Sequence, residues 1–423
     1  MSKQDQREAV ILVDPIMTGE AFKETCRSLG FSVVSVYSVS AEVLAEVAPA
    51  HRDKDDVSLY VRSPADLPDD FGRPVRAVVP ATEPGVFLAD TLAARLGLRG
   101  NDPARAMARR NKAEMRRLAA AGGLRIPDFR IVSGVAGLAA AAEAVGYPVI
   151  VKPATGAASR DVRLVEDAGR LPSTAAGLGP LDLFGADVEE WLVERYVRGR
   201  ELAVNMFSID GEHRVIDIWE YRQPGTADYD QPYWDLLQIR DTDPLFAEAV
   251  RFAAEVLDCF GVRFGPSHIE VKCADDGIHL IEIGSRLPGA SIAEHWELNS
   301  SFKPYADTLA VLLGRTEEIR ASFTPDGRVE FGSVPAICCI RNDDRPGILR
   351  EIYGLAQAAA IPGVQVVHAP HRPGDFIPMT QDLNTVVAKF LVSGPTEADA
   401  LKTLQAVRST ISVEITQHEA VAR

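Results

Sequence analysis

The chain has 423 residues, of which 46% are hydrophobic and 25% are charged, a composition typical of a globular protein with two or three domains. Its 45 lysines and arginines against 60 aspartates and glutamates give a net charge of −15, which argues against a general affinity for nucleic acid or for an anionic membrane. No stretch approaches the roughly 20 apolar residues of a membrane span, and the N-terminus lacks the apolar core of a secretory signal. We therefore expect a cytoplasmic protein.

The first hundred residues alternate strand and helix signals, which predicts a doubly wound parallel sheet over residues 1–100. Short apolar runs indicate its strands, at 9–13, 31–37, 57–61 and 75–80. No GxGxxG motif follows the first run, so the fingerprint of a dinucleotide-binding domain is missing. Glu83 comes just after the last run, where side chains of such a domain face a cleft.

A basic helix is predicted next. Asn101, Asp102 and Pro103 form a helix start, and the helix is expected to end at the glycines 122 and 123. We interpret most of its basic face as solvated; this face contains Arg109, Arg110, Lys112, Arg116 and Arg117.

Residues 146–165, GYPVIVKPATGAASRDVRLV, contain a buried strand that ends near Lys152, a loop of small residues at 154–159, and a second strand. Small residues let backbone N–H groups approach a ligand closely, and consecutive N–H groups can bind phosphate oxygens. An ordinary flexible hairpin is the alternative, because the Walker A motif GxxxxGK[ST] is absent.

Two glutamates on a predicted hairpin pose a sharper question. In HIEVKCADDGIHLIEIGSR (268–286), two apolar runs flank the turn residues 274–277, so Glu270 and Glu282 are expected nearly opposite each other. Like charges that face each other destabilise a strand pair unless they stay solvated or share a cation. We favour a shared cation.

Other segments complete the pattern. Residues 191–210, WLVERYVRGRELAVNMFSID, predict two strands joined through Arg198, Gly199 and Arg200. The polar, aromatic stretch 225–235 is typical of a loop over a site. The last hundred residues predict a small α+β domain with a packing or capping role and no catalytic constellation.

Taken together, these pieces resemble the ATP-grasp superfamily. Lys112 on a helix, PVIVKP with its small-residue loop, LVERYVRGREL, and the paired glutamates before an arginine occur in the order and spacing of that family. The resemblance implies an ATP-grasp fold of α/β and α+β class. Its expected parts are an N-terminal doubly wound domain at 1–100, a core at 101–314 with a nucleotide-covering lid at about 125–197, and a C-terminal α+β domain at 315–423.

GPSHIEV (265–271) and EIGSRLPGAS (282–291) look most like the branch of this superfamily that joins amino acids, the L-amino acid ligases of the dapdiamide synthetase type. Members of the superfamily activate a carboxylate with ATP as an acyl phosphate, which an amine then attacks with release of ADP and phosphate. The resemblance thus implies a ligase that forms an amide between two amino acids or amino-acid-like acids. It also implies ATP with Mg²⁺, or Mn²⁺ in its place, and it permits a homodimer.

The resemblance implies that two lysines hold the phosphates. Lys112 and Lys152 match the phosphate-contacting lysines of the family, and a surface lysine is the alternative for Lys112. The loop between them is expected to fold over the terminal phosphate through Thr155, Gly156, Ala157 and Ser159.

The nucleoside is expected at a hinge after the lid. The family's hinge, whose backbone meets adenine, corresponds to Glu194, Tyr196 and Val197. Glu201 matches the acidic residue that binds the ribose hydroxyls, with a salt bridge to Arg198 or Arg200 as the alternative.

Glu270 and Glu282 match the family's Mg²⁺ ligands, which would explain their facing positions on the hairpin. The usual pattern on the second strand is Glu-x-Asn-x-Arg, and this chain has Gly284 in place of the asparagine, which removes one oxygen ligand. Arg286 matches the arginine that stabilises the transferred phosphoryl group, with an ion pair to one of the two glutamates as the alternative.

Further side chains are expected around the substrates. His268 lies on the same strand face as Glu270 and is expected to orient a substrate carboxylate or to take the amine's proton, with a buried structural histidine as the alternative. Gly289 and Ser291 match a loop that binds a substrate carboxylate in D-alanine ligases, and Glu83 is expected to bind a substrate amino group.

Two other functions compete with this interpretation. A biotin-dependent carboxylase subunit would share the fold, but the GPSHIEV context and the lack of a Met-Lys-Met type segment argue against it. A nucleotide-binding regulator without turnover has only Gly284 in its favour, against the retained Lys152, Glu270, Glu282 and Arg286. The substrates themselves are not encoded in any motif.

Overall fold

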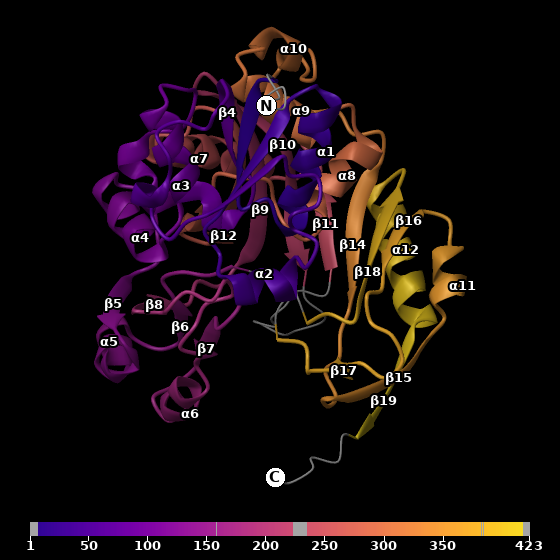
Figure 1. Cartoon of the computed structure of the whole chain (residues 1–423). Coiled ribbons are helices and arrows are strands. Elements are labelled where there is room, and N and C mark those ends of the chain that lie inside the picture. Colours follow the sequence, from indigo (N-terminus) through magenta and orange to yellow (C-terminus); the bar gives the residue numbers. More distant parts are fainter. Residues whose placement is uncertain (1–6, 158, 223–234, 382, 384, 418–423) are drawn as a thin grey trace.

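The computed structural model describes residues 7–157, 159–222, 235–381, 383 and 385–417, and it arranges them around four sheets (Figure 1). The aromatic loop predicted to lie over the site falls almost entirely at 223–234 and therefore lies outside the described residues. Among the described residues, no helix combines the length and apolarity that crossing a membrane requires.

The N-terminal sheet is parallel throughout, with strand order β3-β2-β1-β4, which confirms the predicted doubly wound unit. Its strands are β1 (Ala9–Val13), β2 (Ser32–Tyr37), β3 (Val57–Tyr60) and β4 (Val75–Pro80), and its helices are α1 (Ala21–Ser28), α2 (Ala41–Val47) and α3 (Val86–Arg95). α1 packs on one face and α3 on the other, so β1 and β2 are fully buried. Successive strands are added on one side of β1 up to β3 and on its other side at β4, so a crevice is expected at the carboxyl ends of β1 and β4.

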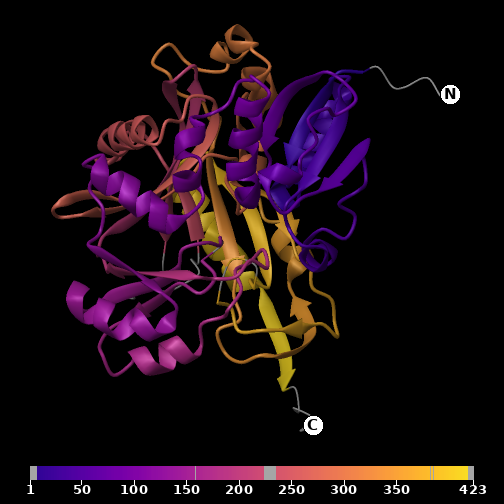
Figure 2. The same ribbon diagram turned by 60° about the vertical axis from the view of Figure 1, so that its left-hand side comes forward.

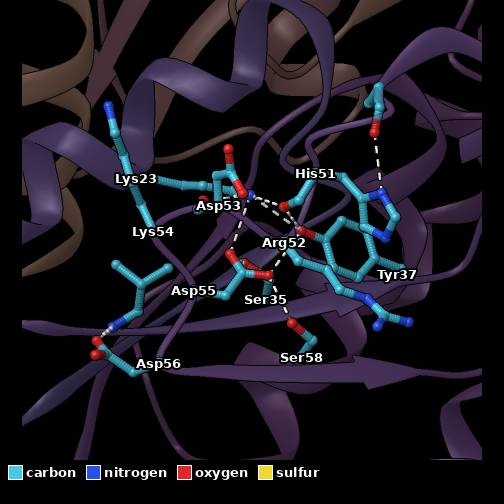
Figure 3. A network of polar contacts seen from close by, with 12 residues as sticks. Lys23, Ser35, Tyr37, His51, Arg52, Asp53, Lys54, Asp55, Asp56 and Ser58 are labelled. Atoms are coloured by element: carbon cyan, nitrogen blue, oxygen red, sulfur yellow. Dashed lines mark hydrogen bonds and ion pairs between the residues drawn. The ribbon is translucent and has the colours of Figure 1, made fainter. Parts of the chain in front are cut away.

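A buried polar network holds the segment after α2 against this sheet (Figure 3). Lys23 on α1 has no exposed surface, and its ammonium lies 3.0 Å from the Asp55 carboxylate and 3.0 Å from the Tyr37 hydroxyl. It also donates to the His51 carbonyl, so the buried charge is both paired and hydrogen-bonded. Tyr37 packs in one cluster with α2 and with Phe184 of the lid, so this network supports a surface on which the lid rests.

The central sheet is antiparallel and has eight strands, in the order β13-β12-β9-β10-β11-β14-β18-β16. These strands are β9 (Arg200–Ile209), β10 (Glu212–Arg222), β11 (Asp235–Ile239), β12 (Gly265–Ala274), β13 (Gly277–Gly284), β14 (Val334–Ile340), β16 (Val364–His368) and β18 (Ala388–Gly394). Pairing of β11 with β14 joins the last hundred residues to the core, so the C-terminal strands extend the sheet that carries the paired glutamates (Figure 1).

Helices cover both faces of the central sheet. α7 (Phe246–Cys259) packs on one face, whereas α8 (Ile292–Asn299), α9 (Pro304–Leu312) and the N-terminal sheet pack on the other. At the C-terminal end, α12 (Glu397–Thr410) covers β14 and β18. The remaining elements of this end are α10 (Thr316–Arg320), α11 (Leu355–Ala359), and the strands β15 (Gly347–Tyr353), β17 (Phe376–Ile377) and β19 (Ser412–Gln417) of a third sheet.

The lid is a separate antiparallel sheet with its own core, in the order β5-β8-β6-β7. Its elements are β5 (Phe129–Ser133), α5 (Leu138–Val145), β6 (Val149–Pro153), β7 (Arg163–Val165), α6 (Leu171–Ala176) and β8 (Glu190–Arg195). It forms the lower left lobe in both views (Figures 1 and 2). The chain then crosses from β8 of the lid directly into β9 of the central sheet.

The long helix predicted from Asn101 is wrong in its first half. Two 3₁₀ turns, Pro103–Arg105 and Met107–Arg109, come first, and the α-helix α4 (Lys112–Ala121) starts only later. Its start is set by Asn111, whose side-chain oxygen accepts from the N–H groups of Ala113 and Glu114. The cap places Lys112 in the first helical position.

The predicted solvated face of this segment is also wrong. Arg109 has no exposed surface and pairs with buried Asp90 at 2.7 Å, and Arg116 is buried as well. Of the five basic residues, Arg117 is the one that lies largely in solvent. The helical pattern correctly placed these basic residues on one segment. Some of them point inward because they pair with carboxylates that are distant in the sequence.

Candidate functional site

A cavity of about 440 Å³ is lined by the N-terminal domain, the lid and the central sheet. The structure brings together at this cavity every residue that the sequence singled out for binding or catalysis: Glu83, Lys112, Lys152, Thr155, Gly156, Ala157, Ser159, Glu194, Tyr196, Val197, Glu201, His268, Glu270, Glu282, Arg286, Gly289 and Ser291. The contacts among them indicate what each can do.

Lys152 belongs to a buried trio of charges. It is the penultimate residue of β6, and its ammonium lies 2.7 Å from the Glu194 carboxylate, whose other oxygen accepts from Arg116 Nε at 2.6 Å. Burial lowers the pKa of Lys152 against the opposing effect of Glu194, and for Glu194 burial is outweighed by Arg116 and Lys152, so its pKa is also lowered. Two cations therefore share one carboxylate, which leaves a net positive charge beside the cavity. The sequence assigned Glu194 a backbone contact alone and missed this side-chain role.

Lys112 is buried, so the surface-lysine alternative is excluded. Its ammonium lies 3.0 Å from Glu282 and donates to the Gly156 carbonyl at 3.1 Å, while its backbone N–H donates to the Ala154 carbonyl. Lys112 thus contacts both the small-residue loop and the hairpin that carries the two glutamates.

The loop at 154–159 presents polar groups to the cavity. Gly156 has φ +110°, a conformation that favours glycine, and the Thr155 hydroxyl is buried without a hydrogen-bond partner among the described residues. An unsatisfied buried hydroxyl is costly unless a ligand completes it. Together with the two lysines, this loop favours an anionic ligand over an ordinary flexible hairpin.

Glu270 and Glu282 are register partners on β12 and β13, as predicted. Glu282 is paired with Lys112, and Glu270 accepts from the Tyr221 hydroxyl at 3.1 Å. Burial acts to raise the pKa of Glu270, but His268, 3.3 Å away, and Tyr221 outweigh it, so the carboxylate is ionised more readily than usual. Each glutamate therefore has a neighbouring donor that offsets the repulsion between the two facing carboxylates.

The two carboxylates fit a hard divalent cation. Within the described parts of the chain, no group of three or more histidine, cysteine, aspartate or glutamate side chains is arranged to hold a metal alone. Mg²⁺ is usually held by one or two carboxylates together with substrate phosphates and water, and this donor set suits that mode. The residues that would hold it are Glu270 and Glu282.

His268 is held in one ring orientation by a chain of hydrogen bonds. Asn205 donates through Nδ2 to Asp217 at 2.7 Å, which leaves its Oδ1 to accept from His268 Nδ1 at 2.8 Å. Asp217 is buried and also accepts from two tryptophan side chains, at 2.6 and 2.8 Å. His268 Nε2 therefore faces Glu270 and the cavity, so this histidine is positioned by structure and exposed to a ligand at the same time.

Arg286 pairs with Glu83 and with neither of the two hairpin glutamates, so that alternative is wrong. Its Nε donates to Glu83 at 2.7 Å, a contact between residues 203 positions apart. This pair also explains Gly284, because a Cβ there would lie 3.2 Å from both the Glu83 carboxylate and the Arg286 guanidinium. In the usual pattern of the family an asparagine stands in place of Gly284. Here the Glu83–Arg286 ion pair, which joins two domains, occupies the space next to this position.

Glu201 pairs with Lys272 at 2.7 Å, a partner that the sequence analysis did not consider. The two residues are register partners on β9 and β12. Burial acts to lower the pKa of Lys272, but Glu201 outweighs it and the pKa is raised. The sequence analysis missed Lys272, although it is two residues after Glu270 and so shares its strand face.

One backbone N–H group of the hinge at 194–197, that of Val197, is available to a ligand. The N–H of Arg195 donates to the Asp128 carbonyl and that of Tyr196 to the Pro148 carbonyl. Among the described residues, the Val197 N–H has no partner. A ring nitrogen at this wall of the cavity would therefore meet Val197.

The cavity lining also includes residues that the sequence analysis did not find. Leu383 and Lys389 of the C-terminal region line it, together with Met17, Thr18 and Thr82 of the N-terminal domain. In the loop before α8, Ala290 and Ser291 both have positive φ, at 54° and 68°, which turns the backbone sharply at the cavity wall. No motif signals Lys389, because it lies alone in an apolar strand.

Comparison with known proteins places this arrangement in a family. A family model described as ATP-grasp domain matches residues 145–294, and a second, described as L-amino acid ligase C-terminal domain 2, matches residues 343–416. Residues 145–294 thus form an ATP-grasp domain, and residues 343–416 match the C-terminal domain described for L-amino acid ligases. The chain is a ligase of the ATP-grasp fold, as its sequence motifs indicated.

Full-length relatives agree with this ATP-grasp assignment. The chain is 24% identical over 409 residues to an L-arginine-specific L-amino acid ligase of Bacillus subtilis, covering 96% of each chain. It is 26% identical over 307 residues to dapdiamide A synthase of Enterobacter agglomerans, covering 69% of this chain and 70% of the relative. The solved L-amino acid ligase of Bacillus licheniformis shares the fold, with a TM-score of 0.75, 18% identity, and coverage of 98% and 100%.

Proposed function

We propose that this protein joins two amino acids, or amino-acid-like acids, through an amide bond at the expense of ATP. The observation that carries the proposal is one continuous cavity that connects the buried Lys112 and Lys152 and the facing glutamate pair with the Glu83–Arg286 pair. The named relatives act in the same class of reaction: one is an L-amino acid ligase and another is dapdiamide A synthase. They favour this function over bicarbonate carboxylation.

The nucleotide is proposed to lie along the lid side of the cavity. Val197 supplies a free hinge N–H for the adenine ring, and Glu201, held by Lys272, is placed for the ribose hydroxyls. The positive trio around Lys152 and the ammonium of Lys112 face the phosphates, where two cations from separate elements stabilise charge better than one.

Lys112 is proposed to exchange partners when substrates bind. In the structure its ammonium neutralises Glu282. Glu270 and Glu282 would hold Mg²⁺, which supplies positive charge at the terminal phosphates when bound. Lys112 is then free to turn toward a phosphate oxygen without leaving either carboxylate uncompensated. This exchange predicts that the metal and the nucleotide bind cooperatively.

Arg286 is proposed to stabilise the phosphoryl group as a carboxylate oxygen of the first substrate attacks the terminal phosphorus and ADP leaves. In the structure this arginine is held by Glu83. A substrate ammonium that binds Glu83 would compete for the same oxygens and release the guanidinium toward the reacting carboxylate. The first substrate thereby completes the site that activates it.

His268 is proposed to take the proton of the second substrate's amine. Its Nδ1 is directed at Asn205, so Nε2 faces the cavity. As the amine nitrogen attacks the acyl carbon, inorganic phosphate leaves and the amine proton passes to Nε2.

The test is ADP release with Mg-ATP while pairs of amino acids are screened, with Glu282→Ala as the impaired variant. Turnover that needs both an acid and an amine, and that the variant loses, would support the proposal. Glu255→Gln, which changes an exposed glutamate on α7, is the matched control and should retain full turnover. Release that depends on bicarbonate instead would favour a carboxylase. ATP binding without release in any pair would favour a regulator, although Gly284 no longer supports one, since the ion pair accounts for it.

A further inference from the structure

Lys389 enters the cavity from the C-terminal part of the central sheet. It lies on β18, between Cys339 of β14 and His368 of β16. Side chains alternate along a strand, so Lys389 points to the same face as Cys339, which packs with the core beneath the cavity, whereas Phe390 faces α12. The cavity is accordingly lined by Lys389.

Lys389 has no charged partner among the residues that the structure describes. Four lysines line the cavity, and three of them are paired, with Glu282, Glu194 and Glu201. Lys389 makes neither an ion pair nor a side-chain hydrogen bond with any residue that the structure describes.

Two described acids on neighbouring elements have other partners. Glu294 of α8 binds His368 at 2.9 Å, and Asp235 of β11 binds Arg408. A partly buried ammonium without a counter-ion is unfavourable, and an anionic ligand removes that cost.

The position of Lys389 separates it from the phosphate-binding groups. β18 is five strands from β12 in the sheet, which corresponds to roughly 24 Å at about 4.8 Å per strand. One lysine side chain at that distance does not serve phosphates held beside Glu270. Its ligand must be another anion, at the substrate end of the cavity.

The proposed reaction supplies such an anion. Glu83 accounts for the ammonium of the first amino acid, and Arg286 faces its reacting carboxylate, but the second amino acid brings a carboxylate of its own. We propose that Lys389 binds the α-carboxylate of this second, amine-donating amino acid. This inference rests on the proposed function, and it makes the C-terminal domain a part of the substrate site. Glu83 and Lys389 would then hold the two charged ends of the dipeptide product.

The experiment compares the best amine-donating amino acid of the screen with its own carboxamide, which keeps the amine and loses the negative charge. Kinetics are measured at saturating ATP and first substrate for the wild type, Lys389→Met and Lys389→Arg. The wild type should prefer the acid over the amide, and Lys389→Met should raise the KM of the acid by about 10- to 100-fold while leaving that of the amide unchanged, as expected for the loss of a charge-assisted hydrogen bond. Lys389→Arg should restore most of the preference.

Lys402→Met, an exposed lysine on α12, is the matched control and should behave as wild type. A Lys389→Met protein that keeps the preference for the acid, or that loses affinity for the first substrate or for ATP instead, overturns the inference while the ligase activity stands. A wild-type protein that releases no ADP with any amino-acid pair overturns the proposed function, and the inference with it. Thermal unfolding of each variant shows whether a loss reflects the fold.

Discussion

The two ends of the cavity are built differently. At the nucleotide end, Lys112, Lys152 and Lys272 each face a carboxylate within the core and lid. At the substrate end, Glu83 comes from the N-terminal domain, Arg286 from the core and Lys389 from the C-terminal strands. The nucleotide end is held by contacts between adjacent strands and the helix beside them, whereas the substrate end exists only when three distant parts of the chain are assembled.

This difference has a functional consequence. A nucleotide site that is neutralised by its own carboxylates keeps its geometry without ligand, and ligands enter by exchanging partners. A substrate site assembled from three domains can change its specificity through any one of them without disturbing the nucleotide. The predictions below separate the two ends by which substrate, and which property, each substitution affects.

The largest effect is expected for Glu194→Gln at the nucleotide end. This change leaves Arg116 and Lys152 buried side by side without their shared carboxylate. Removing one partner of a buried ionic group typically costs about 3–5 kcal/mol of unfolding free energy. Urea denaturation measures it. Glu114→Gln, which removes an exposed pair with Arg117, is the control and should cost less than about 1 kcal/mol. Equal losses of unfolding free energy in the two variants would show that this buried trio stabilises the fold no more than an exposed ion pair does.

A smaller effect, on binding alone, is expected for Glu83→Gln at the substrate end. The loss of a charged partner for the substrate ammonium should raise the KM of the first amino acid by about 10- to 100-fold. The KM of ATP should stay within about twofold, because no nucleotide contact is assigned to this residue. Steady-state kinetics with each substrate varied in turn gives both values. A rise confined to ATP would mean that the two ends of the cavity have been assigned in reverse.

A third prediction concerns Gly284→Ala, which adds a Cβ 3.2 Å from both members of the Glu83–Arg286 pair. The pair must shift by a few tenths of an ångström, and kcat should fall about tenfold with ATP affinity unchanged. Gly332→Ala is the matched control, since a Cβ there meets no atom within 4 Å. Unchanged kcat in the Gly284 variant would show that the pair adapts freely and that its position is not critical.

The smallest effect is expected on the pH dependence of the unfolding free energy, at the contact between α8 and β14. His295 on α8 donates to the Ala336 carbonyl of β14, and burial lowers its pKa to about 3. The folded protein keeps this histidine neutral while the unfolded chain protonates it near pH 6.5, so its stabilising contribution is present above pH 6.5 and is lost as the pH falls.

Between pH 7 and 5.5, the unfolding free energy of the wild type should fall by about 1 kcal/mol more than that of His295→Gln. The difference between the two proteins is diagnostic because Asp14 and Asp217, whose pKa values burial raises to about 6, act in the opposite direction. Their contribution is present at low pH and is lost as the pH rises through about 6. Parallel pH profiles of wild type and variant, by chemical denaturation, would contradict the assignment.

The sequence by itself determined the ATP-grasp resemblance, the parallel N-terminal sheet and a set of candidate residues that all line the cavity. These follow from local patterns: apolar runs form strands, and residues two apart on a strand, such as His268 and Glu270, must share a face. Each pattern spans only a few residues, so nearby positions are sufficient to recognise it.

The tertiary structure alone decided which charges meet. Arg109 and Arg116 were expected in solvent and are buried, because Asp90 and Glu194 approach them from other elements. An ion pair with a hairpin glutamate was the alternative for Arg286, which instead pairs with Glu83 over Gly284. An ion pair forms between side chains within about 4 Å, and which side chains reach that distance depends on how whole domains pack.

The position of the C-terminal region also depends on how whole domains pack, so the sequence did not reveal it. Its strands were expected to form a separate capping unit, but β14 pairs with β11 and carries β18, with Lys389, to the cavity. An edge strand can accept any strand with a compatible pattern, so a sequence with several apolar strands does not specify which edges join. That pairing, made between residues about a hundred positions apart, is what brings a third part of the chain to the cavity.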